Sequence, residues 1–574
     1  MNASRISPCI YNPQLSIIFL ILFAPALFGL AARPRAVVVI VLHVHWRAPC
    51  VAEGVKIGRV TNPAPTLPVT SDPKKDADYV FYELTRTICP ECRRVLDGHV
   101  LIRDNRVYMR RRCPDHDVFE GLVYGDAQLY TNSAKFNKPG TIPVEFTAEV
   151  KEGCPHDCGL CPDHQQHACL GIIEVNSACD MACPLCFAEA GPGFNLTLEE
   201  VEDILDHYVR AEGNPQVVQF SGGEPSIHPQ IIPMMKAARE RGIPNVMLNT
   251  NGKRIATDDR FLAELAEVRP NIYFQFDGFD SETYRIIRGE PDILPKKLRA
   301  LDRLAEIDCT VILVPAVERG VNEHEIGRIV RLGLDHPAVR GINFQAAFHT
   351  GRHAKHDPMQ RMTNPDIIKL IEEQTEGLFR QTDFIPVPCC FPTCNSVTYA
   401  YIDNEKNVTP LPRILNVEDY LDYISNRVMP DLGAEIRRAL EGLWSSSAVL
   451  GSEKVAREFS FSCSACGLPD GGLDVKGLSK FIFMIMLQDF MDPWTFNQKN
   501  LMKCCKEFLL PGGKQIPFCA YNTIGYREQA RQQLMAQERD RVAARRAGTR
   551  YQVQPVIFSF KDNVENSDLV KLDR

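Results

Sequence analysis

The 574-residue sequence has little net charge and no internal repeat or low-complexity segment. Its 65 basic and 72 acidic residues give a formal net charge of −7, which argues against a surface built to bind nucleic-acid phosphates, so we expect no nucleic-acid partner. A hydrophobic fraction of 45% against 24% charged residues excludes an intrinsically disordered chain. The length leaves room for one large core domain and smaller attachments.

Charge is missing altogether from a stretch near the amino terminus. No charged residue lies between Arg5 and Arg33, and residues 15–32 are almost wholly apolar. This stretch is long enough for one membrane span or for the core of a signal peptide, but an upstream start site or a poorly ordered extension explains it equally well. Because export would expose the later cysteines to an oxidising compartment, we expect the working part to be cytoplasmic, with membrane association left open.

The chain is rich in cysteine, with 21 residues that occur in groups. A chain of this length builds its own core without a disulfide framework, so grouped cysteines favour metal binding. Cys89-x2-Cys92 and Cys113-x2-His116 flank the short β-like stretches 100–103 and 106–110. Two such pairs joined by a hairpin are typical of a ribbon that holds one tetrahedral ion, either zinc or a single iron. His116 could instead be a capping or surface residue.

A second group of ligand-type residues follows within about sixteen positions, and it is too dense for core packing. Which of its members bind a metal is left open. The group comprises Cys154, Cys158, Cys161 and Cys169, with His156, His164 and His167 between them.

The central region alternates apolar, β-branched runs with helical patterns. One helix has an opening typical of a capping box, from Thr197 to Glu200. Strict alternation predicts an α/β fold with a parallel sheet and right-handed crossovers, curled into a partial (βα)6 barrel. Such a barrel has its chemistry at the carboxyl ends of the strands. The expected strands are 171–175, 217–220, 246–249, 272–276, 310–314 and 341–344.

Unusual residues follow the first four of these strands. Cys179, Cys183 and Cys186 come after the first, where three thiolates on one loop can hold three irons of a cubane cluster and leave the fourth iron open. A zinc knuckle is the alternative, but structural zinc requires four ligands. The next strand ends carry Gly222-Gly223-Glu224, then Asn249, then Gln275 and Asp277.

With the three-cysteine loop followed by Gly222-Gly223-Glu224-Pro225, the chain resembles the radical S-adenosylmethionine (SAM) superfamily. The resemblance implies a [4Fe-4S] cluster on Cys179, Cys183 and Cys186, and a SAM molecule that is cleaved to a 5′-deoxyadenosyl radical. It also implies a set of SAM contacts, but no catalytic side chain. These contacts are Gly222, Gly223 and Glu224 for the amino group, Asn249, Gln275 and Asp277 for the carboxylate or ribose, and Phe187 for adenine.

More cysteines follow the barrel and suggest one or two auxiliary [4Fe-4S] clusters. The whole pattern, from the ribbon to Cys519, resembles the archaeal tetraether lipid synthase family and its bacterial relatives. That resemblance implies C–C coupling of lipid alkyl chains, with three [4Fe-4S] clusters and one mononuclear iron. The candidate ligands outnumber the sites so implied, so some group is only partly used. The candidate ligands in this part are Cys390, Cys394, Cys463, Cys466, Cys504, Cys505 and Cys519.

Three other functions are alternatives to the coupling of lipid chains. One is a radical SAM methyltransferase that takes carbon from methylene-tetrahydrofolate and acts on a pterin-like substrate, and another is a peptide-modifying maturase. The third is a non-enzymatic iron–sulfur or zinc-ribbon protein. A lipid enzyme needs an apolar tunnel, for which 481–487 is a candidate wall or else a buried helix or strand, whereas a pterin enzyme needs a short polar pocket.

The expected partners are a lipid or other small-molecule substrate, an electron donor such as ferredoxin or flavodoxin, and in the lipid case a membrane surface. Composition and motifs divide the chain into five regions. These are an apolar extension with a proline-rich linker (1–75), a cysteine-rich metal ribbon (76–169), the radical SAM barrel (170–380), an auxiliary-cluster region (381–525) and a charged helical tail (526–574).

Overall fold

The computed structural model describes residues 77–353, 356–388, 390–413 and 481–558. The chain separates into the units Met1–Lys75 and Asp76–Arg574, and the described residues all belong to the second. The apolar stretch 15–32 and the predicted ligands Cys463 and Cys466 therefore lie outside the described residues. Within the described ranges, no helix is both long enough and apolar enough to cross a membrane.

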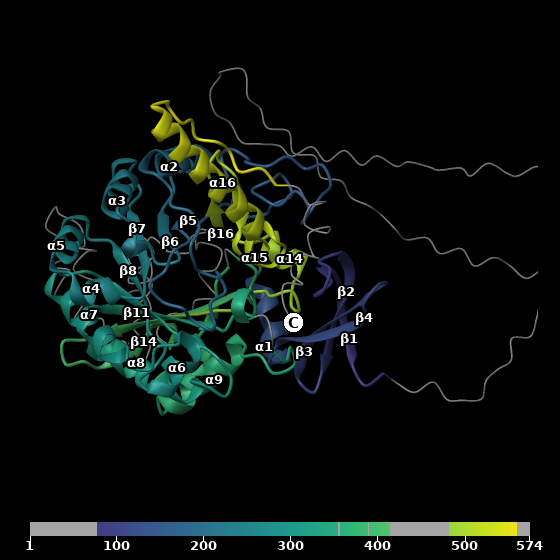
Figure 1. Ribbon diagram of the computed structural model, residues 1–574. Coiled ribbons are helices and arrows are strands. Elements are labelled where there is room, and N and C mark those ends of the chain that lie inside the picture. The colour runs from purple at the N-terminus through teal and green to yellow at the C-terminus, as the bar shows by residue number, and fades with distance from the viewer. Residues whose placement is uncertain (1–76, 354–355, 389, 414–480, 559–574) are drawn as a thin grey trace, which may run out of the picture. The chain divides into compact units, whose positions relative to one another are not determined.

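The described part begins with a four-stranded antiparallel sheet in the order β1-β2-β3-β4 (Figure 1). Its inner face packs Val100, Val107 and Met109 against Tyr130 of the following helix. The two β-like stretches predicted from the sequence fall in the central strands, so the ribbon fold is confirmed. The elements are β1 (Val80–Ile88), β2 (Val95–Arg103), β3 (Arg106–Cys113), β4 (Asp117–Tyr124) and α1 (Ala127–Ser133).

A second, thirteen-stranded sheet contains the predicted barrel. All six expected strands are present, each within two residues of its predicted ends, and neighbours along the sheet are parallel. The fold class predicted from the alternating pattern is therefore confirmed. The strands are β5 (Leu170–Asn176), β6 (Val217–Gly222), β7 (Asn245–Thr250), β8 (Asn271–Gln275), β9 (Val311–Val314) and β11 (Val339–Ala346).

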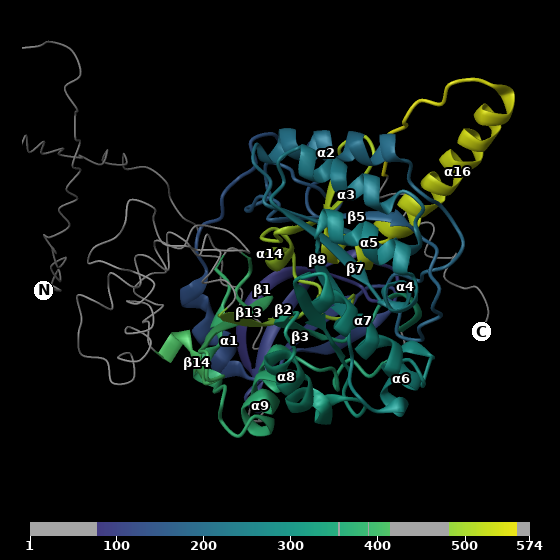
Figure 2. The same cartoon turned by 90° about the vertical axis from the view of Figure 1, so that its left-hand side faces the viewer.

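Helices cover the outer face of these strands, as Figure 2 shows for α3, α4, α5 and α7. The first begins with the predicted capping box, in which Thr197 Oγ1 accepts from the Glu200 backbone and the Glu200 carboxylate accepts from the Thr197 backbone. The helices are α2 (Leu198–Glu212), α3 (Ile231–Glu240), α4 (Lys253–Thr257), α5 (Asp259–Val268), α6 (Ser281–Arg288), α7 (Leu294–Glu306), α8 (Ile326–Asp335) and α9 (Asn364–Gln374).

Strands from the carboxyl-terminal part extend both ends of the barrel sheet. β15 (Ile482–Gln488) pairs with β11 in parallel, and β16 (Lys506–Leu509) pairs with β5 in parallel. The apolar run at 481–487 is thus a buried strand of the barrel sheet. The remaining strands are β10 (Ala316–Val317), β12 (Ile385–Pro386), β13 (Asn395–Ile402), β14 (Val408–Pro410) and β17 (Gln515–Pro517).

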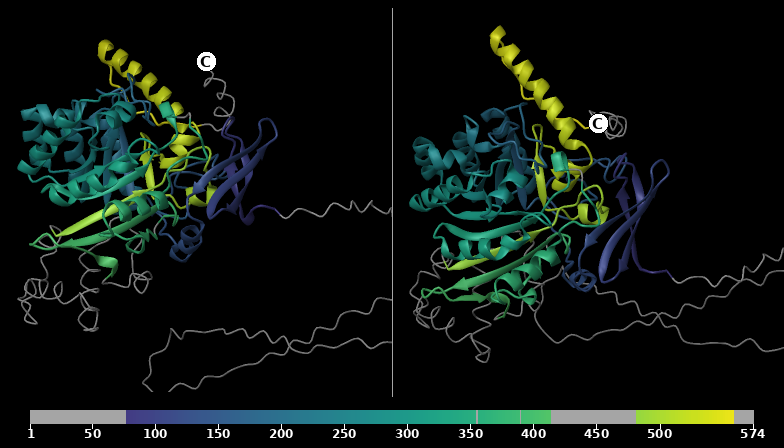
Figure 3. Two further views of the ribbon diagram at one scale, coloured as in Figure 1. Left: turned by 90° about the horizontal axis from the view of Figure 1, so that it is seen from below. Right: turned by 60° about the horizontal axis from the view of Figure 1, so that its bottom comes forward.

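Three helices complete the described chain: α14 (Gln498–Leu501), α15 (Phe518–Thr523) and α16 (Tyr526–Ala547). The first turns of α16 bury Tyr526, Arg527, Ala530 and Leu534 against the barrel core, and the rest of the helix projects outward (Figure 3). Helix α16 is therefore anchored at its amino-terminal end and exposed at its carboxyl-terminal end.

The position of β15 predicts a large cost for truncating its central side chain. Ile485 is fully buried between β11 and β13, so Ile485→Ala should destabilise the protein by about 2–5 kcal/mol. Val542→Ala on exposed α16 is the control and should change stability by no more than about 0.5 kcal/mol. The midpoint of thermal unfolding followed by circular dichroism measures both. Equal midpoints for the two variants would contradict the placement of β15 in the core.

Candidate active site

A pocket with a volume of about 180 Å³ opens at the carboxyl ends of the barrel strands. Its wall includes residues from the ends of β5, β6, β7, β8 and β11, and from the added strands β15 and β16. This is the edge at which a parallel barrel has its chemistry. The pocket is therefore the candidate active site.

The three cysteines after β5 all line this pocket. Cys179, Cys183 and Cys186 form a small apolar cluster with Met181 and Tyr284. Burial raises the pKa of Cys179 to about 12, so its thiol keeps a proton unless a metal takes the proton's place. Three sulfur donors on one loop, facing an open pocket, suit an iron–sulfur cluster with one iron left for another ligand.

The paired glycines at the end of β6 fit against the backbone of the cysteine loop. A Cβ atom on Gly222 would lie 2.2 Å from the Asn176 carbonyl oxygen, and one on Gly223 would lie 2.1 Å from the Ala178 carbonyl oxygen. The Gly223 amide donates to the Asn176 carbonyl at 2.8 Å. Only glycine allows this approach, which fixes the loop over the barrel.

Glu224, predicted to contact the SAM amino group, is buried and already engaged. Its carboxylate accepts from the Ser226 amide at 3.0 Å, from Thr250 Oγ1 at 2.7 Å and from the Asn251 amide at 2.7 Å. Burial raises the pKa of Glu224 despite these bonds. An ionised carboxylate has about four acceptor positions, so roughly one is left for a ligand.

Asp277, predicted as a contact for the SAM carboxylate or ribose, does not line the pocket. It is fully buried and forms a bidentate ion pair with Arg288, with distances of 2.7 and 2.6 Å. Arg288 does line the pocket and faces Cys183. The sequence pattern thus predicted the correct strand end. The group that reaches the pocket, however, is the guanidinium of Arg288, which Asp277 orients.

The other predicted SAM contacts do lie on the pocket wall. Asn249 donates to Ser221 Oγ at 3.2 Å, and Phe187 packs against two other rings. Gln275 accepts from the buried ammonium of Lys297 through its backbone oxygen at 2.7 Å and its side chain at 3.2 Å. Burial lowers the pKa of Lys297 to about 8. Lys297 was not predicted, because it lies in the first turn of α7, away from any motif.

The far wall of the pocket joins aromatic rings to an ion pair, and of these residues the sequence predicted only Phe187. Arg527 from the start of α16 pairs with Glu174 of β5, and Tyr521 donates to the same carboxylate at 3.1 Å. These residues are more than 340 positions apart, so no local pattern joins them. The rings on this wall are Phe187, Phe348, Phe490, Phe508 and Phe518.

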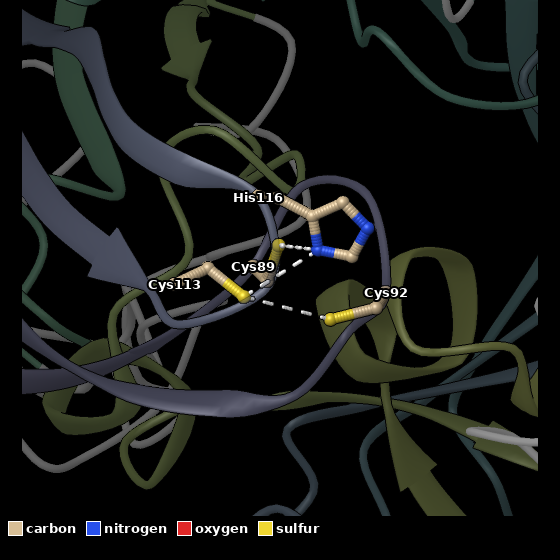
Figure 4. Close-up of side chains that lie close together, drawn as sticks. All are labelled: Cys89, Cys92, Cys113 and His116. Atoms are coloured by element: carbon tan, nitrogen blue, oxygen red, sulfur yellow. Dashed lines mark hydrogen bonds between the residues drawn. The ribbon is translucent and has the colours of Figure 1, made fainter.

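The amino-terminal ribbon brings its four predicted ligands together, as Figure 4 shows. His116 Nδ1 lies 3.5 Å from the sulfur of Cys113 and 3.8 Å from that of Cys89, and the sulfurs of Cys92 and Cys113 are 3.9 Å apart. Ligands of a tetrahedral ion with metal–sulfur bonds of about 2.3 Å lie about 3.8 Å apart. The four side chains could therefore hold one ion.

A further cysteine cluster lies inside the molecule, beside the pocket. Cys169, Cys390, Cys394 and Cys505 pack together, and the buried ammonium of Lys506 faces three of them. Cys504 does not join this cluster and packs on the main core instead. Neighbouring cysteines in the sequence therefore have different surroundings, and the four clustered sulfurs are candidate ligands of an auxiliary iron–sulfur site.

Cys154, Cys158 and Cys161 lie around a small separate cavity together with His164. Burial raises the pKa of Cys158 well above its ordinary value, and the nearby Cys154 thiolate adds to the shift. Cys519 is buried in α15. Two members of the second predicted group remain: His167 pairs with Glu212 at 2.7 Å, and the backbone carbonyl of His156 accepts from the Tyr526 hydroxyl at 2.8 Å.

The barrel, the three-cysteine loop and the glycine pair that holds it define a radical SAM enzyme, whose cofactors are a [4Fe-4S] cluster and SAM. Residues 173–333 match the family model of the Radical SAM superfamily, and residues 81–125 match the HMPTM N-terminal zinc ribbon domain. The ribbon and the additional cysteine groups fit auxiliary metal sites.

One relative is similar along most of the chain. The 7,8-dihydro-6-hydroxymethylpterin dimethyltransferase of Methanocaldococcus jannaschii is 32% identical over 480 residues, which cover 77% of this chain and 94% of that protein. The chain therefore belongs to the family of this dimethyltransferase, within the radical SAM superfamily. The resemblance to the tetraether lipid synthase family is not shown by these comparisons.

Other similarities are confined to part of the chain. The GTP 3′,8-cyclase of Chlorobaculum tepidum is 33% identical over 177 residues, 30% of this chain and 52% of that protein, so the match spans about half of that relative. Among solved structures, Streptococcus suis SuiB bound to S-adenosylmethionine has a TM-score of 0.32 at 16% identity, covering 37% of this chain and 47% of that one.

The close fit of the glycines predicts that one added methyl group displaces the cysteine loop. Gly223→Ala places a Cβ against the Ala178 carbonyl, so we expect the protein to lose most of its cluster iron and of its SAM binding. Gly191→Ala is the matched control, because its added Cβ would have no neighbour closer than 3.9 Å. Iron content and equilibrium binding of SAM are the measurements. Retention of both in Gly223→Ala would contradict the fit.

Proposed function

We propose that the protein is a radical SAM methyltransferase that acts on a reduced pterin, with methylene-tetrahydrofolate as the carbon donor. The similarity to the pterin dimethyltransferase carries the proposal, because it extends over both the ribbon and the barrel and covers 94% of that protein. A match confined to the barrel would support only the general class of enzyme.

The lining of the pocket supports a flat, polar substrate better than an alkyl chain. Glutamine side chains 219, 275, 345 and 488 line it together with Glu174 and Arg527. Amide and charged groups of this kind pair with the ring nitrogens and carbonyl of a pterin, and the nearby phenylalanine rings can stack on its face. A lipid chain could form no hydrogen bond with these polar groups, which would then pair only with other protein side chains, as Glu174 and Arg527 do with each other. Contact with a membrane surface was expected only for a lipid substrate, so the pterin proposal gives no reason to expect it.

We assign the following roles to the pocket residues. Cys179, Cys183 and Cys186 hold the [4Fe-4S] cluster, which together with bound SAM supplies the 5′-deoxyadenosyl radical. Gly222 and Gly223 hold the loop that carries these cysteines. The glutamines, Glu174 and Arg527 line the space beside the cluster and orient the substrate with their polar atoms. The phenylalanine rings of the same wall exclude water.

Charged groups at the edge of the cluster site act as fixed partners. Arg288, oriented by Asp277, faces Cys183 and stabilises its thiolate. Lys297 is held by the carbonyls of Asn251 and Gln275, so its charge stays next to the site. The electron that starts the reaction would come from a donor such as ferredoxin or flavodoxin, which a chemical reductant replaces in the assay.

The assay offers the anaerobically reconstituted protein SAM, dithionite, methylene-tetrahydrofolate and 7,8-dihydro-6-hydroxymethylpterin. We expect 5′-deoxyadenosine and a pterin that has gained one or two methyl groups, both measured by mass spectrometry. Parallel reactions contain membrane lipids in place of the pterin. Unchanged pterin, together with lipid that has lost hydrogen on coupling, would overturn the proposal in favour of the lipid function.

Removal of one cluster ligand should abolish the radical step. Cys183→Ser is expected to lower 5′-deoxyadenosine formation at least a hundredfold, because serine is a poor ligand for iron in such a cluster. Cys309→Ala is the control, since Cys309 is buried in the core away from the pocket and should leave the rate within about twofold. The measurement is the rate of 5′-deoxyadenosine release. Equal rates for the two variants would refute the assignment of Cys183 as a cluster ligand.

A further inference from the structure

Five ionisable side chains to which the proposed function gives no role lie together beside the pocket. They are Glu318, His349, His353, His356 and Asp492. Two overlapping sets of three have nitrogen and oxygen atoms within 4.8 Å of one another, and His349 belongs to both. Imidazole and carboxylate are the ligand pair of many zinc and non-haem iron sites.

The fold brings these residues together from three neighbouring strands. Glu318 directly follows β10, His349 and His353 follow β11, and Asp492 follows β15. β10 and β15 both pair with β11 in parallel, so all the side chains lie at the carboxyl end of the barrel. His353 and its neighbour Phe348 also line the pocket.

The distance between Glu318 and His349 suits two ligands of one ion, and the distance between Glu318 and His353 is slightly shorter. Glu318 Oε2 lies 3.0 Å from His353 Nε2 and 3.5 Å from His349 Nε2. For a tetrahedral ion with bonds of about 2.0–2.2 Å to nitrogen and oxygen, ligand atoms lie about 3.3–3.6 Å apart, a range that contains the His349 distance. The His353 distance is that of a hydrogen bond, and it would have to lengthen by a few tenths of an ångström when an ion binds. Although burial opposes ionisation, the two histidines bring the pKa of Glu318 down to about 2, so the carboxylate is charged.

His349 also has the outer partner that a metal-bound histidine usually has. Its Nδ1 lies 3.5 Å from Asp492 Oδ2, and both atoms are buried without a hydrogen bond of good geometry within the described residues. A ligating histidine commonly donates its second N–H to a carboxylate, which fixes the ring. His356 stacks on His349 with ring centroids 3.7 Å apart and further restricts it.

A network of hydrogen bonds without metal is the competing explanation, and the geometry favours it less. His353 and Glu318 are within hydrogen-bond distance at 3.0 Å, as such a network requires, but both contacts of His349 to carboxylates are 3.5 Å long, beyond the usual 2.7–3.2 Å. Arg361 and Arg111 are cations that lie near Asp492, on the side of the five-residue group away from Glu318. Arg361 is paired mainly with Asp489. Among the described residues, neither arginine forms an ion pair or a hydrogen bond with Glu318.

We propose that Glu318, His349 and His353 bind a divalent transition-metal ion such as Zn²⁺, with Asp492 orienting His349. Two histidines and one glutamate form a set with three protein ligands, as in zinc sites that keep a position for another ligand. That position is beside the pocket wall to which His353 belongs. The site is separate from the four-ligand ribbon and from the cysteine groups that the structure describes, and it does not depend on the identity of the substrate.

The test counts zinc in the full-length, cluster-loaded protein after zinc loading and gel filtration, by inductively coupled plasma mass spectrometry. We expect about two zinc ions per chain, one in the ribbon and one in the new site. Glu318→Gln and His353→Gln should each lose one of them and keep the iron content of the parent. Cys92→Ser should lose the ribbon ion alone, and combining it with Glu318→Gln should remove both.

Two outcomes overturn the proposal. One is an equal zinc content in the parent and in both Glu318→Gln and His353→Gln, with the iron content and circular dichroism of all three unchanged. The other concerns the Cys92→Ser variant, whose remaining zinc should show only nitrogen and oxygen neighbours at about 2.0–2.2 Å in X-ray absorption. A sulfur neighbour there would place the ion among cysteines instead. Because His353 is partly exposed, His353→Gln keeps the test valid if Glu318→Gln folds poorly.

Discussion

The near contact between the end of β6 and the loop after β5 is the constraint on which the site depends. Gly222 and Gly223 lie so close to the backbone of residues 176–178 that no side chain fits between them. The loop is thereby fixed over the barrel, with its three cysteines toward the pocket. Glu224 ties the same strand end to β7 through Thr250 and Asn251. Loop, glycines and glutamate form one connected framework whose geometry comes mostly from the backbone.

Closure of the barrel sheet brings distant cysteines to one place. β16 pairs with β5 so that Lys506 lies opposite Leu170, which makes Cys505 and Cys169 neighbours across the two strands. Cys390 and Cys394 precede β13, at the other side of the sheet. Lys506 Nζ donates to Asn395 Oδ1 at 2.9 Å and so joins the two sides directly. A cluster bound to these four cysteines would connect the sheet edges, so metal loading and barrel closure should be linked.

The sequence predicted the features that are local. Six buried strands were recognisable because their apolar runs are continuous, and the ribbon because its ligand pairs have a characteristic spacing. The pairing of β15 and β16 with the barrel was not predictable, since both strands lie far along the chain from their partners. The same holds for the ion pair between Arg527 and Glu174. Asp277 shows a different limit, because a carboxylate at a strand end can face a ligand or, as here, a guanidinium.

The choice between lipid and pterin shows why a motif can identify a reaction class without its substrate. The cysteines and glycines that produce the radical are needed whatever the substrate, so they contain no information about it. In the proposed function the substrate is selected by the pocket wall, to which Glu174, Gln345, Gln488 and Arg527 contribute from four separate elements. Each is an ordinary residue in its own strand or helix, and only the closed sheet makes them one polar surface. A tunnel for an alkyl chain would require these polar groups to be replaced together, because removing one member of a pair such as Glu174 and Arg527 leaves the other unpaired, at a cost of about 1–3 kcal/mol.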